Sequence, residues 1–158
     1  MSTVAAGEAA SDPVLHPLIQ RLLAEFRYVN ASVESFASIV DAPGHVLLFF
    51  TEDPARYRET LDLAVILPEL ERAFAGRFKA AVILPEAARA LAPRYGFRRW
   101  PAFVMLRDGQ YVGAIDGVRD WDAYVTEVAR LLAAEPTRPP SIGIAVKATG
   151  EGDAPACA

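Results

Sequence analysis

The sequence predicts an α/β domain: a mixed central sheet of about four to five strands, helices on both faces, and an extra N-terminal helix. Two continuous apolar runs, at residues 45–50 and 78–84, are typical of strands that are buried on both faces of a helix-covered sheet. An Asp-Gly pair at 108–109, between two further apolar runs, predicts an antiparallel hairpin. Segments with apolar residues at helical spacing separate these strands, so the sheet combines parallel and antiparallel pairs.

Composition limits the class of protein. The chain has 158 residues and a net charge of −4, and this length is enough for one domain with its own hydrophobic core. Although 53% of the residues are hydrophobic, no window approaches the roughly 20 consecutive apolar residues of a membrane span. The acidic balance argues against nucleic acid, whose phosphates require a basic surface. The first residues lack the charged-then-apolar order of a secretory signal, so we expect a cytoplasmic protein.

The chain divides into three predicted segments. Residues 1–12 are small and polar, which predicts a disordered N-terminus, and residues 13–134 form the folded domain. Residues 135–158 contain four of the twelve prolines and few large apolar residues, which predicts a flexible C-terminal tail. The short apolar stretch 142–146 within this tail either docks on the body or on a partner, or stays part of a disordered tail.

The first predicted helix covers residues 13–26. Its apolar residues recur at helical spacing, namely Leu18, Ile19, Leu22, Leu23 and Phe26. Residues 27–29 suit a short strand. Ser32 is a helix-capping residue type and predicts a short helix over 33–40, which ends before the turn residues at 41–44.

A long helix, predicted over 58–75, follows the strand at 45–50 and the polar loop at 51–57. Its buried side is marked by Leu63, Leu67, Leu70 and Phe74. Because an interior proline removes a backbone hydrogen bond, we expect a kink at Pro68. Gly76 ends the helix.

The second half of the chain completes the sheet. Pro85 begins a helix over 85–94 after the strand at 78–84. Because a helix joins the two buried strands, they are expected to be parallel, with a right-handed crossover. The hairpin then pairs residues 102–107 with 111–116.

Asp120 is predicted to cap the last helix, which extends to Ala134. Its predicted buried face consists of Trp121, Val125, Val128 and Leu132.

Cysteine and histidine usage excludes common site types. Cys157 is the only cysteine, so the chain has no internal disulfide and no Cys-x-x-Cys pair. His16 and His45 lack the spacing of zinc ligands. The sequence therefore predicts no metal and no cofactor.

The stretch YGFRRWPAF at 95–103, together with the order of elements, resembles the thioredoxin fold. In that pattern a helix ends in Tyr-Gly, a short loop and an apolar residue precede a cis-proline, and two strands joined by an Asn-Gly or Asp-Gly turn lead to a final helix. The match covers about residues 28–134. It implies a cis Trp100–Pro101 bond and a solvent-facing backbone before Pro101 that pairs with an extended peptide. The alternative is a trans proline that only begins a strand.

The redox half of the thioredoxin pattern is missing. Thioredoxins carry Cys-x-x-Cys between the first buried strand and the long helix, a position that falls at 54–57 or 57–60 here, and neither window contains a cysteine. Without a thiolate, disulfide exchange has no nucleophile at this site. The aspartate that assists thioredoxin catalysis also has no counterpart in the strand HVLLFF at 45–50. The resemblance therefore implies a fold kept without its reaction, and not an enzyme.

Among cysteine-less branches, the sequence is similar to the HyaE/HoxO-type hydrogenase maturation proteins. The similarity rests on the N-terminal helix and on HVLLFFTEDPARYRET (45–60), LAVILPELERAF (63–74) and YGFRRWPAFVMLRDGQYVGAIDGVRDWDAY (95–124). It implies a cytoplasmic chaperone for the small subunit of an uptake nickel–iron hydrogenase. Such a chaperone binds the precursor, including its twin-arginine signal peptide, until iron–sulfur clusters are installed. It works beside a second accessory protein of the same operon.

The proline loop supplies the first candidate peptide-binding residues. Pro101 is the strongest of them, and Trp100 is either a platform for the peptide or part of the core. Arg98 and Arg99 either meet an acidic segment of the partner or stay exposed to water. Tyr57 is expected to fill space that the catalytic disulfide would occupy.

Four carboxylates complete the candidate site: Glu52, Asp53, Glu59 and Asp62. They either accept contacts from the paired arginines of a signal peptide or form a solvated surface near the start of the long helix.

Two other functions remain open from the sequence. One is a thiol-dependent redox protein that uses Cys157, although Glu151 and Asp153 nearby would raise the pKa of that thiol. The other is a scaffold that recruits another maturation factor through residues 142–146.

Overall fold

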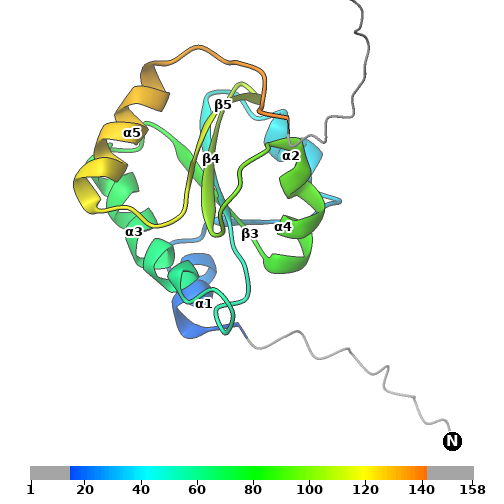
Figure 1. The fold of residues 1–158 in the computed structure, drawn as a ribbon, viewed down its shortest axis with the longest axis vertical. Helices are drawn as coiled ribbons and strands as arrows, with labels where there is room; N and C mark the ends of the chain where they lie inside the picture. The colour runs from blue at the N-terminus through cyan, green and yellow to red at the C-terminus, as the bar shows by residue number, and fades with distance from the viewer. Residues whose placement is uncertain (1–14, 142–158) are drawn as a thin grey trace, which may run out of the picture.

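The computed structural model describes residues 15–141 and confirms the predicted α/β class (Figure 1). A five-stranded mixed sheet forms the centre, in the order β1-β3-β2-β4-β5. The strands are β1 (Val29–Ala31), β2 (His45–Phe50), β3 (Lys79–Ile83), β4 (Ala102–Arg107) and β5 (Gln110–Asp116). The helices are α1 (Pro17–Ala24), α2 (Phe36–Val40), α3 (Glu59–Ala73), α4 (Pro85–Leu91) with the 3₁₀ turn η1 (Ala92–Arg94), and α5 (Trp121–Ala133). Residues 1–12, the stretch 142–146 and Cys157 lie outside the described residues.

Strand pairing follows the predicted directions. β2 and β3 are parallel, as the helix between them requires, and β1 also pairs parallel to β3. β4 is antiparallel to both β2 and β5. In the hairpin turn Asp108 has φ +49 and Gly109 has φ +81, which is the left-handed geometry that a two-residue Asp-Gly turn adopts.

The sheet separates two hydrophobic cores. Helices α1, α3 and α5 cover one face, and α2 and α4 cover the other (Figure 1). The strand HVLLFF serves both cores because successive side chains point to opposite faces. Leu47 and Phe49 lie in the first core, and Val46, Leu48 and Phe50 in the second. This explains why the run is continuously apolar.

Several predicted boundaries were wrong near the N-terminus. The first helix spans Pro17–Ala24, not 13–26. The first strand spans Val29–Ala31, not 27–29, because Arg27 has φ +58 and turns the chain between the two elements. Helix α2 begins at Phe36, not at 33, because Ser32 and Ser35 hydrogen-bond each other in a turn. The kink at Pro68, which lies inside α3, stays a prediction.

The boundaries of later elements shift by a few residues. Helix α3 spans 59–73, β3 spans 79–83, α4 ends at 91 before η1, β5 begins at 110 and α5 ends at 133.

The predicted buried face of α5 was wrong at its first residue. Trp121 is 42% exposed, whereas Tyr124 and Leu131 are fully buried and were missed. Asp120 caps the helix as predicted, and its Oδ1 accepts the N–H of Ala123 at 2.8 Å. A capping residue stands where the chain enters the helix, and here the residue next to it still faces solvent.

The first residues of the predicted tail lie against the body. We call residues 135–141 the C-terminal segment. The N–H of Thr137 donates to the carbonyl of Tyr111 on β5 at 2.8 Å, and Glu135 lies 3.5 Å from Arg107. Pro140 lies against Gly96, where a Cβ added to the glycine would meet the Pro140 oxygen. The chain therefore crosses β5 toward the loop that precedes β4. Across residues 15–141, no helix is both long and apolar enough to cross a bilayer.

Candidate functional site

Three connections meet at one edge of the sheet. Phe50, the last residue of β2, pairs with Ile83 at the end of β3 and with Ala102 at the start of β4. Ala102 in turn pairs with Asp116 at the end of β5. The loops that leave β2 and β5 and the loop that enters β4 are therefore neighbours, although they are far apart in the sequence.

Trp100 stands at the centre of this edge. The Trp100–Pro101 bond is cis, as the thioredoxin resemblance implied. The half-buried indole packs edge-on against Phe97 and Phe50, with ring centroids 5.0 and 6.4 Å apart. Within residues 15–141 neither the N–H nor the C=O of Trp100 has a hydrogen-bond partner. The side chain is thus both anchored in the second core and available at the surface.

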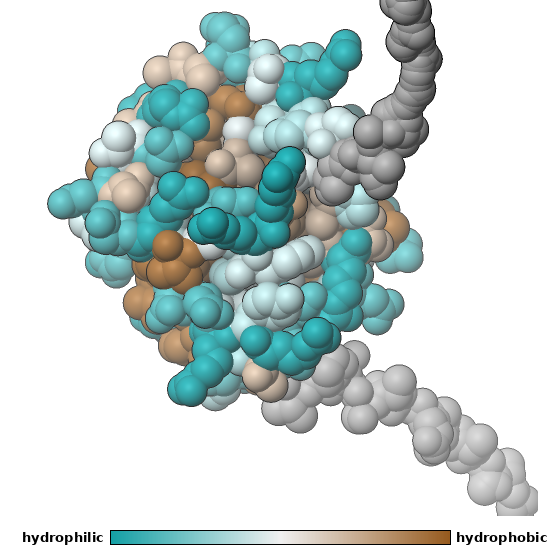
Figure 2. All heavy atoms as spheres, viewed as in Figure 1, coloured by the Kyte–Doolittle hydropathy of each residue, from teal (hydrophilic) through white to brown (hydrophobic). Residues whose placement is uncertain are grey.

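An open hollow of about 430 Å³ lies beside this residue, and we call it the Trp100 hollow. Its lining comes from all three connections and consists of Tyr57, Glu59, Arg98, Arg99, Trp100, Gly117 and Val118. Val118 is 48% exposed and supplies an apolar side chain to the same lining. In Figure 1 the connections into β4 and out of β5 both lie on the near side, and Figure 2 shows hydrophilic residues gathered across the middle of this face.

Asp116 holds the loop before β4 in place. Its Oδ2 accepts the backbone N–H groups of Arg98 at 2.9 Å and Arg99 at 3.2 Å. The N–H of Gly117 donates to the carbonyl of Pro101 at 3.0 Å, which ties the same loop to the end of β5. These bonds fix the backbone and leave both arginine side chains exposed.

Tyr124 holds the connection that follows β5. Its hydroxyl accepts the N–H of Arg119 and donates to the carbonyl of Gly117, each at 3.1 Å. Burial raises the pKa of the Tyr124 hydroxyl, so the group keeps the proton that it donates. A buried side chain of α5 therefore positions the connection that carries Val118.

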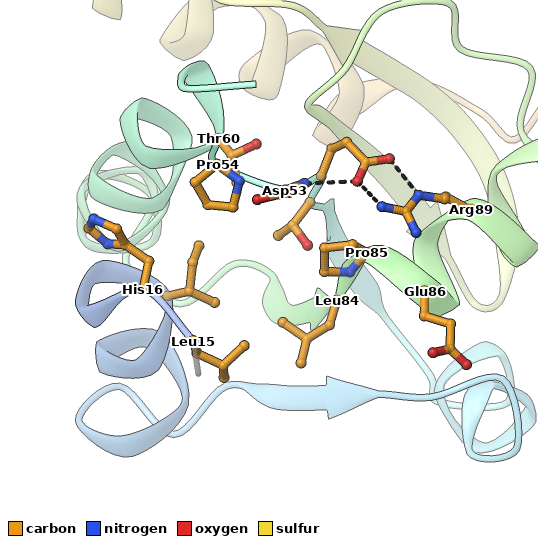
Figure 3. A pocket seen from close by; sticks show the side chains of 12 residues that line it. Leu15, His16, Asp53, Pro54, Thr60, Leu84, Pro85, Glu86 and Arg89 are labelled. Carbon is orange, nitrogen blue, oxygen red and sulfur yellow. Dashed lines mark hydrogen bonds and ion pairs between the residues drawn. The ribbon is translucent and has the colours of Figure 1, made fainter. Parts of the chain in front are cut away.

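A second cavity of about 500 Å³, the Glu52 pocket, lies on the other side of the loop that follows β2 (Figure 3). Its lining consists of Leu15, His16, Ile19, Thr51, Glu52, Asp53, Pro54, Thr60, Leu84, Pro85, Glu86 and Arg89. Figure 3 shows Leu15 and His16 on one side of the cavity and Leu84 and Pro85 on the other. The Thr60 hydroxyl oxygen is buried and has no hydrogen-bond partner among the described residues.

The carboxylate of Glu52 joins this loop to α4. It is 5% exposed and binds the Arg89 guanidinium through two hydrogen bonds, of which the Nε–Oε2 bond measures 2.8 Å. These bonds hold the pKa of Glu52 below its ordinary value, against the opposing effect of burial. One interpretation of the four carboxylates was that they form a solvated surface. Glu52 does not fit it, because this residue is buried. Its second partner, the N–H of Asp53 at 2.8 Å, adds to the same local structure.

The predicted site residues fall into separate groups. Tyr57, Glu59, Arg99 and Trp100 meet in the Trp100 hollow, and the buried Pro101 lies beside it. Glu52 and Asp53 line the Glu52 pocket instead. Asp62 is exposed on α3 and lines neither cavity. Tyr57 belongs to both windows proposed for the place of the thioredoxin cysteines, so the choice between 54–57 and 57–60 stays open.

Sequence reasoning missed Gly117 and Val118, which line the hollow, and Asp116, which holds the loop before β4. A signal was present, because the Asp-Gly pair at 116–117 stands at the end of the predicted strand 111–116 and marks a turn. Antiparallel pairing of the two hairpin strands places the end of the second strand beside the start of the first. The turn after β5 was therefore bound to lie next to Trp100.

The sequence of this site region matches a known protein family. The family model described as Hydrogenase-1 expression protein HyaE matches residues 18–124, which include every residue of the Trp100 hollow. The chain belongs to the HyaE family. HyaE-family membership confirms the resemblance inferred from the sequence.

Curated relatives of this HyaE-family chain are named for hydrogenase expression. It is 41% identical to the hydrogenase expression/formation protein HoxO of Cupriavidus necator over 138 residues, which is 86% of each chain. It is 37% identical to the HoxO of Azotobacter vinelandii over 144 residues, 91% of this chain and 95% of the relative. A crystal structure described provisionally as hydrogenase expression/formation protein hupG of Rhodopseudomonas palustris is 33% identical and covers 66% of this chain and 95% of its own, with a TM-score of 0.47.

Proposed function

We propose that this HyaE-family protein acts in hydrogenase maturation as a non-catalytic chaperone. It binds the precursor of the hydrogenase small subunit, including its twin-arginine signal peptide, in the cytoplasm before export. A second hydrogenase accessory protein is a further partner. Membership of a family whose relatives are named for hydrogenase expression and formation supports the pathway.

One observation carries the binding role: the unpaired backbone of Trp100 beside an open hollow. An extended segment of the partner pairs with the Trp100 N–H and C=O groups, as in recognition by strand addition. Its side chains then contact the indole and Val118 across the hollow. The Asp116 bonds favour this mode, because a loop that is already ordered loses little entropy on binding.

The residues of the hollow support binding instead of thiol chemistry. None of the seven lining residues is a cysteine, and Cys157 is the only one in the sequence. Disulfide exchange needs a thiolate nucleophile, and none of these side chains supplies one.

The proposal is tested by capture of the small-subunit precursor, with and without its signal peptide, on the immobilised protein. Trp100→Ala removes the central aromatic contact, and we expect at least about a tenfold loss of affinity, which is typical of an interface hot spot. Trp121→Ala is the matched control, because Trp121 is also partly exposed but does not line the hollow. We expect it to bind within about twofold of wild type.

Val118→Asp repeats the test without disturbing the aromatic cluster, since Val118 is exposed. It should also weaken capture. Equal affinity of wild type, Trp100→Ala and Val118→Asp would remove the hollow from the proposal. Catalytic reduction of insulin disulfides by the purified protein would contradict the non-catalytic role.

A further inference from the structure

The charge of the Trp100 hollow differs from that of the whole chain. The chain carries a net charge of −4, yet the hollow is lined by two arginines and one carboxylate, that of Glu59. Arg98 and Arg99 form no ion pair with any residue between 15 and 141. Two exposed guanidinium groups without a partner thus lie beside the indole.

The backbone geometry makes this charge a fixed property of the site. The Oδ2 of Asp116 accepts hydrogen bonds from the N–H groups of Arg98 and Arg99. Its Oδ1 lies 3.7 Å from the guanidinium of Arg119. It therefore holds the main chain of the loop, and the guanidinium groups of the two lining arginines stay free. A guanidinium binds a carboxylate through two parallel hydrogen bonds, so such a pair is suited to an acidic group.

We infer that the partner segment in the Trp100 hollow is an extended apolar stretch with a carboxylate that meets Arg98 and Arg99. This inference rests on the proposed function and names the chemistry of the segment bound there. The apolar part contacts Trp100 and Val118, and the acidic side chain lies over the two arginines. The arginine pair of a signal peptide is not held in this hollow, because two like charges line it and Glu59 is the one carboxylate among its lining residues.

The neighbouring cavity adds to the preference of an acidic segment for the Trp100 hollow. In the Glu52 pocket the carboxylate of Glu52 is neutralised by Arg89, while the carboxylates of Asp53 and Glu86 form no ion pair among the described residues. An acidic segment is thus attracted on one side of the loop after β2 and not on the other. The charges therefore determine where along this edge of the sheet an acidic segment binds, as well as how tightly it binds.

The first experiment identifies the bound segment directly. A photoreactive residue is introduced as Val118→p-benzoylphenylalanine, which leaves both arginines in place, and the variant is irradiated with the full small-subunit precursor. We expect mass spectrometry to find the cross-link in a stretch that contains Asp or Glu next to apolar residues. A cross-link confined to the twin-arginine stretch, or no cross-link although the precursor is captured, would overturn the inference.

The second experiment measures the charge dependence. The double variant Arg98→Gln/Arg99→Gln is compared with Arg77→Gln/Arg94→Gln, which removes two other exposed arginines outside the hollow. Exposed ion pairs are modest, so we expect precursor affinity to fall about three- to tenfold for the first variant and less than about twofold for the control. The loss should shrink at 0.5 M salt, a concentration at which exposed charges are strongly screened. Tighter binding by the first variant would refute the acidic segment.

The two experiments separate failure of this inference from failure of the proposed function. If Trp100→Ala abolishes capture but the arginine variant does not weaken it, the hollow binds the precursor through other chemistry. If neither change affects capture, the site itself is wrong.

Discussion

Glu52 and Arg89 join two parts of the site region that lie 37 residues apart in the sequence. The Glu52 side chain is 7% exposed, whereas the Arg89 side chain is 53% exposed, so the pair links the inside of the loop to the surface of α4. Loss of the guanidinium leaves a buried carboxylate without its main partner, which is costly in a protein interior. The pair therefore fixes the loop that separates the two cavities.

This pair makes stability depend on pH in a defined direction. Because Arg89 lowers the pKa of Glu52 from its ordinary 4.5, the pair stabilises the fold fully above that value, and the contribution is lost as the pH falls through the lower pKa of the folded state. We expect Arg89→Leu to reduce the free energy of unfolding at pH 7, and the difference from wild type to shrink below pH 4.5. Urea denaturation at a series of pH values measures this.

The control for that prediction is a Glu52→Gln background, in which the titrating group is gone. There the effect of Arg89→Leu should no longer change between pH 4.5 and lower pH. A pH-independent effect of Arg89→Leu in the wild-type background would show that the pair is not coupled to protonation of Glu52.

At the residue scale, the sequence predicted which residues lie at the site better than it predicted which residues they contact. Trp100, Tyr57 and Arg99 were expected at one site, and the structure brings them together because their loops leave or enter adjacent strand ends. The partner of Glu52 was not predictable, since nothing in the local sequence indicates that Arg89 approaches from α4. Trp121 was misplaced because helical spacing alone does not decide where a buried face begins.

At the scale of elements, the C-terminal segment (135–141) depends on a glycine in the loop before β4. Gly96 has φ +68, and a Cβ there would lie 2.0 Å from the carbonyl oxygen of Pro140. The glycine is therefore required twice, once for its backbone angle and once for the close approach of the segment. The close approach was not predicted from the sequence, because the composition of residues 135–158 predicted a flexible tail.

A matched pair of substitutions separates these two requirements. Gly76 has a similar φ of +75, and a Cβ added there would meet no atom within 4 Å. Gly76→Ala should therefore cost only the backbone strain, about 1–2 kcal/mol. Gly96→Ala should cost roughly 1–3 kcal/mol more, the range found for overpacking, as measured by urea denaturation.

Truncation after Glu135 should remove the extra cost, so that both glycine substitutions then destabilise equally. An extra cost for Gly96→Ala that persists in the truncated chain would place its origin elsewhere in the loop.

Elements with strong local signals were predicted well, and weak ones were not. The hairpin, the apolar strands and the long helix each carry a turn residue, a continuous apolar run or a clear helical period. The shift of α2 to Phe36 had a different origin, because Ser32 and Ser35 were both suitable caps and their mutual hydrogen bonds decide between them. Such choices depend on side-chain geometry that a pattern of residue types does not contain.

On the scale of the whole molecule, the two cores share one sheet, and the N-terminal helix belongs to the first of them. Leu22 of α1 is 1% exposed in the same core as residues of α3 and α5. Because the strands contribute side chains to both faces, loss of one core leaves the other without its supporting sheet. We therefore expect the described domain to unfold as one cooperative unit.

Leu22→Ala tests this unity. The cavity it leaves should lower the free energy of unfolding by about 2–5 kcal/mol, while Gln20→Ala on the exposed side of α1 should change it by less than about 0.5 kcal/mol. Both changes are measured by urea denaturation followed by far-ultraviolet circular dichroism and by tryptophan fluorescence. Trp100 and Trp121 report from parts of the molecule outside α1, so coincident curves indicate one transition. A separate early loss of helix signal would mean that α1 unfolds independently.

The hydrogen bond between Thr137 and Tyr111 has a consequence for self-association. β5 is the last strand on one side of the sheet, and an open outer strand is a template on which a second copy of a protein can polymerise. Here a neighbouring stretch of the same chain already occupies a carbonyl of that strand, and the opposite outer strand, β1, is three residues long. Both outer strands are thus poor templates for pairing with a second copy of the chain.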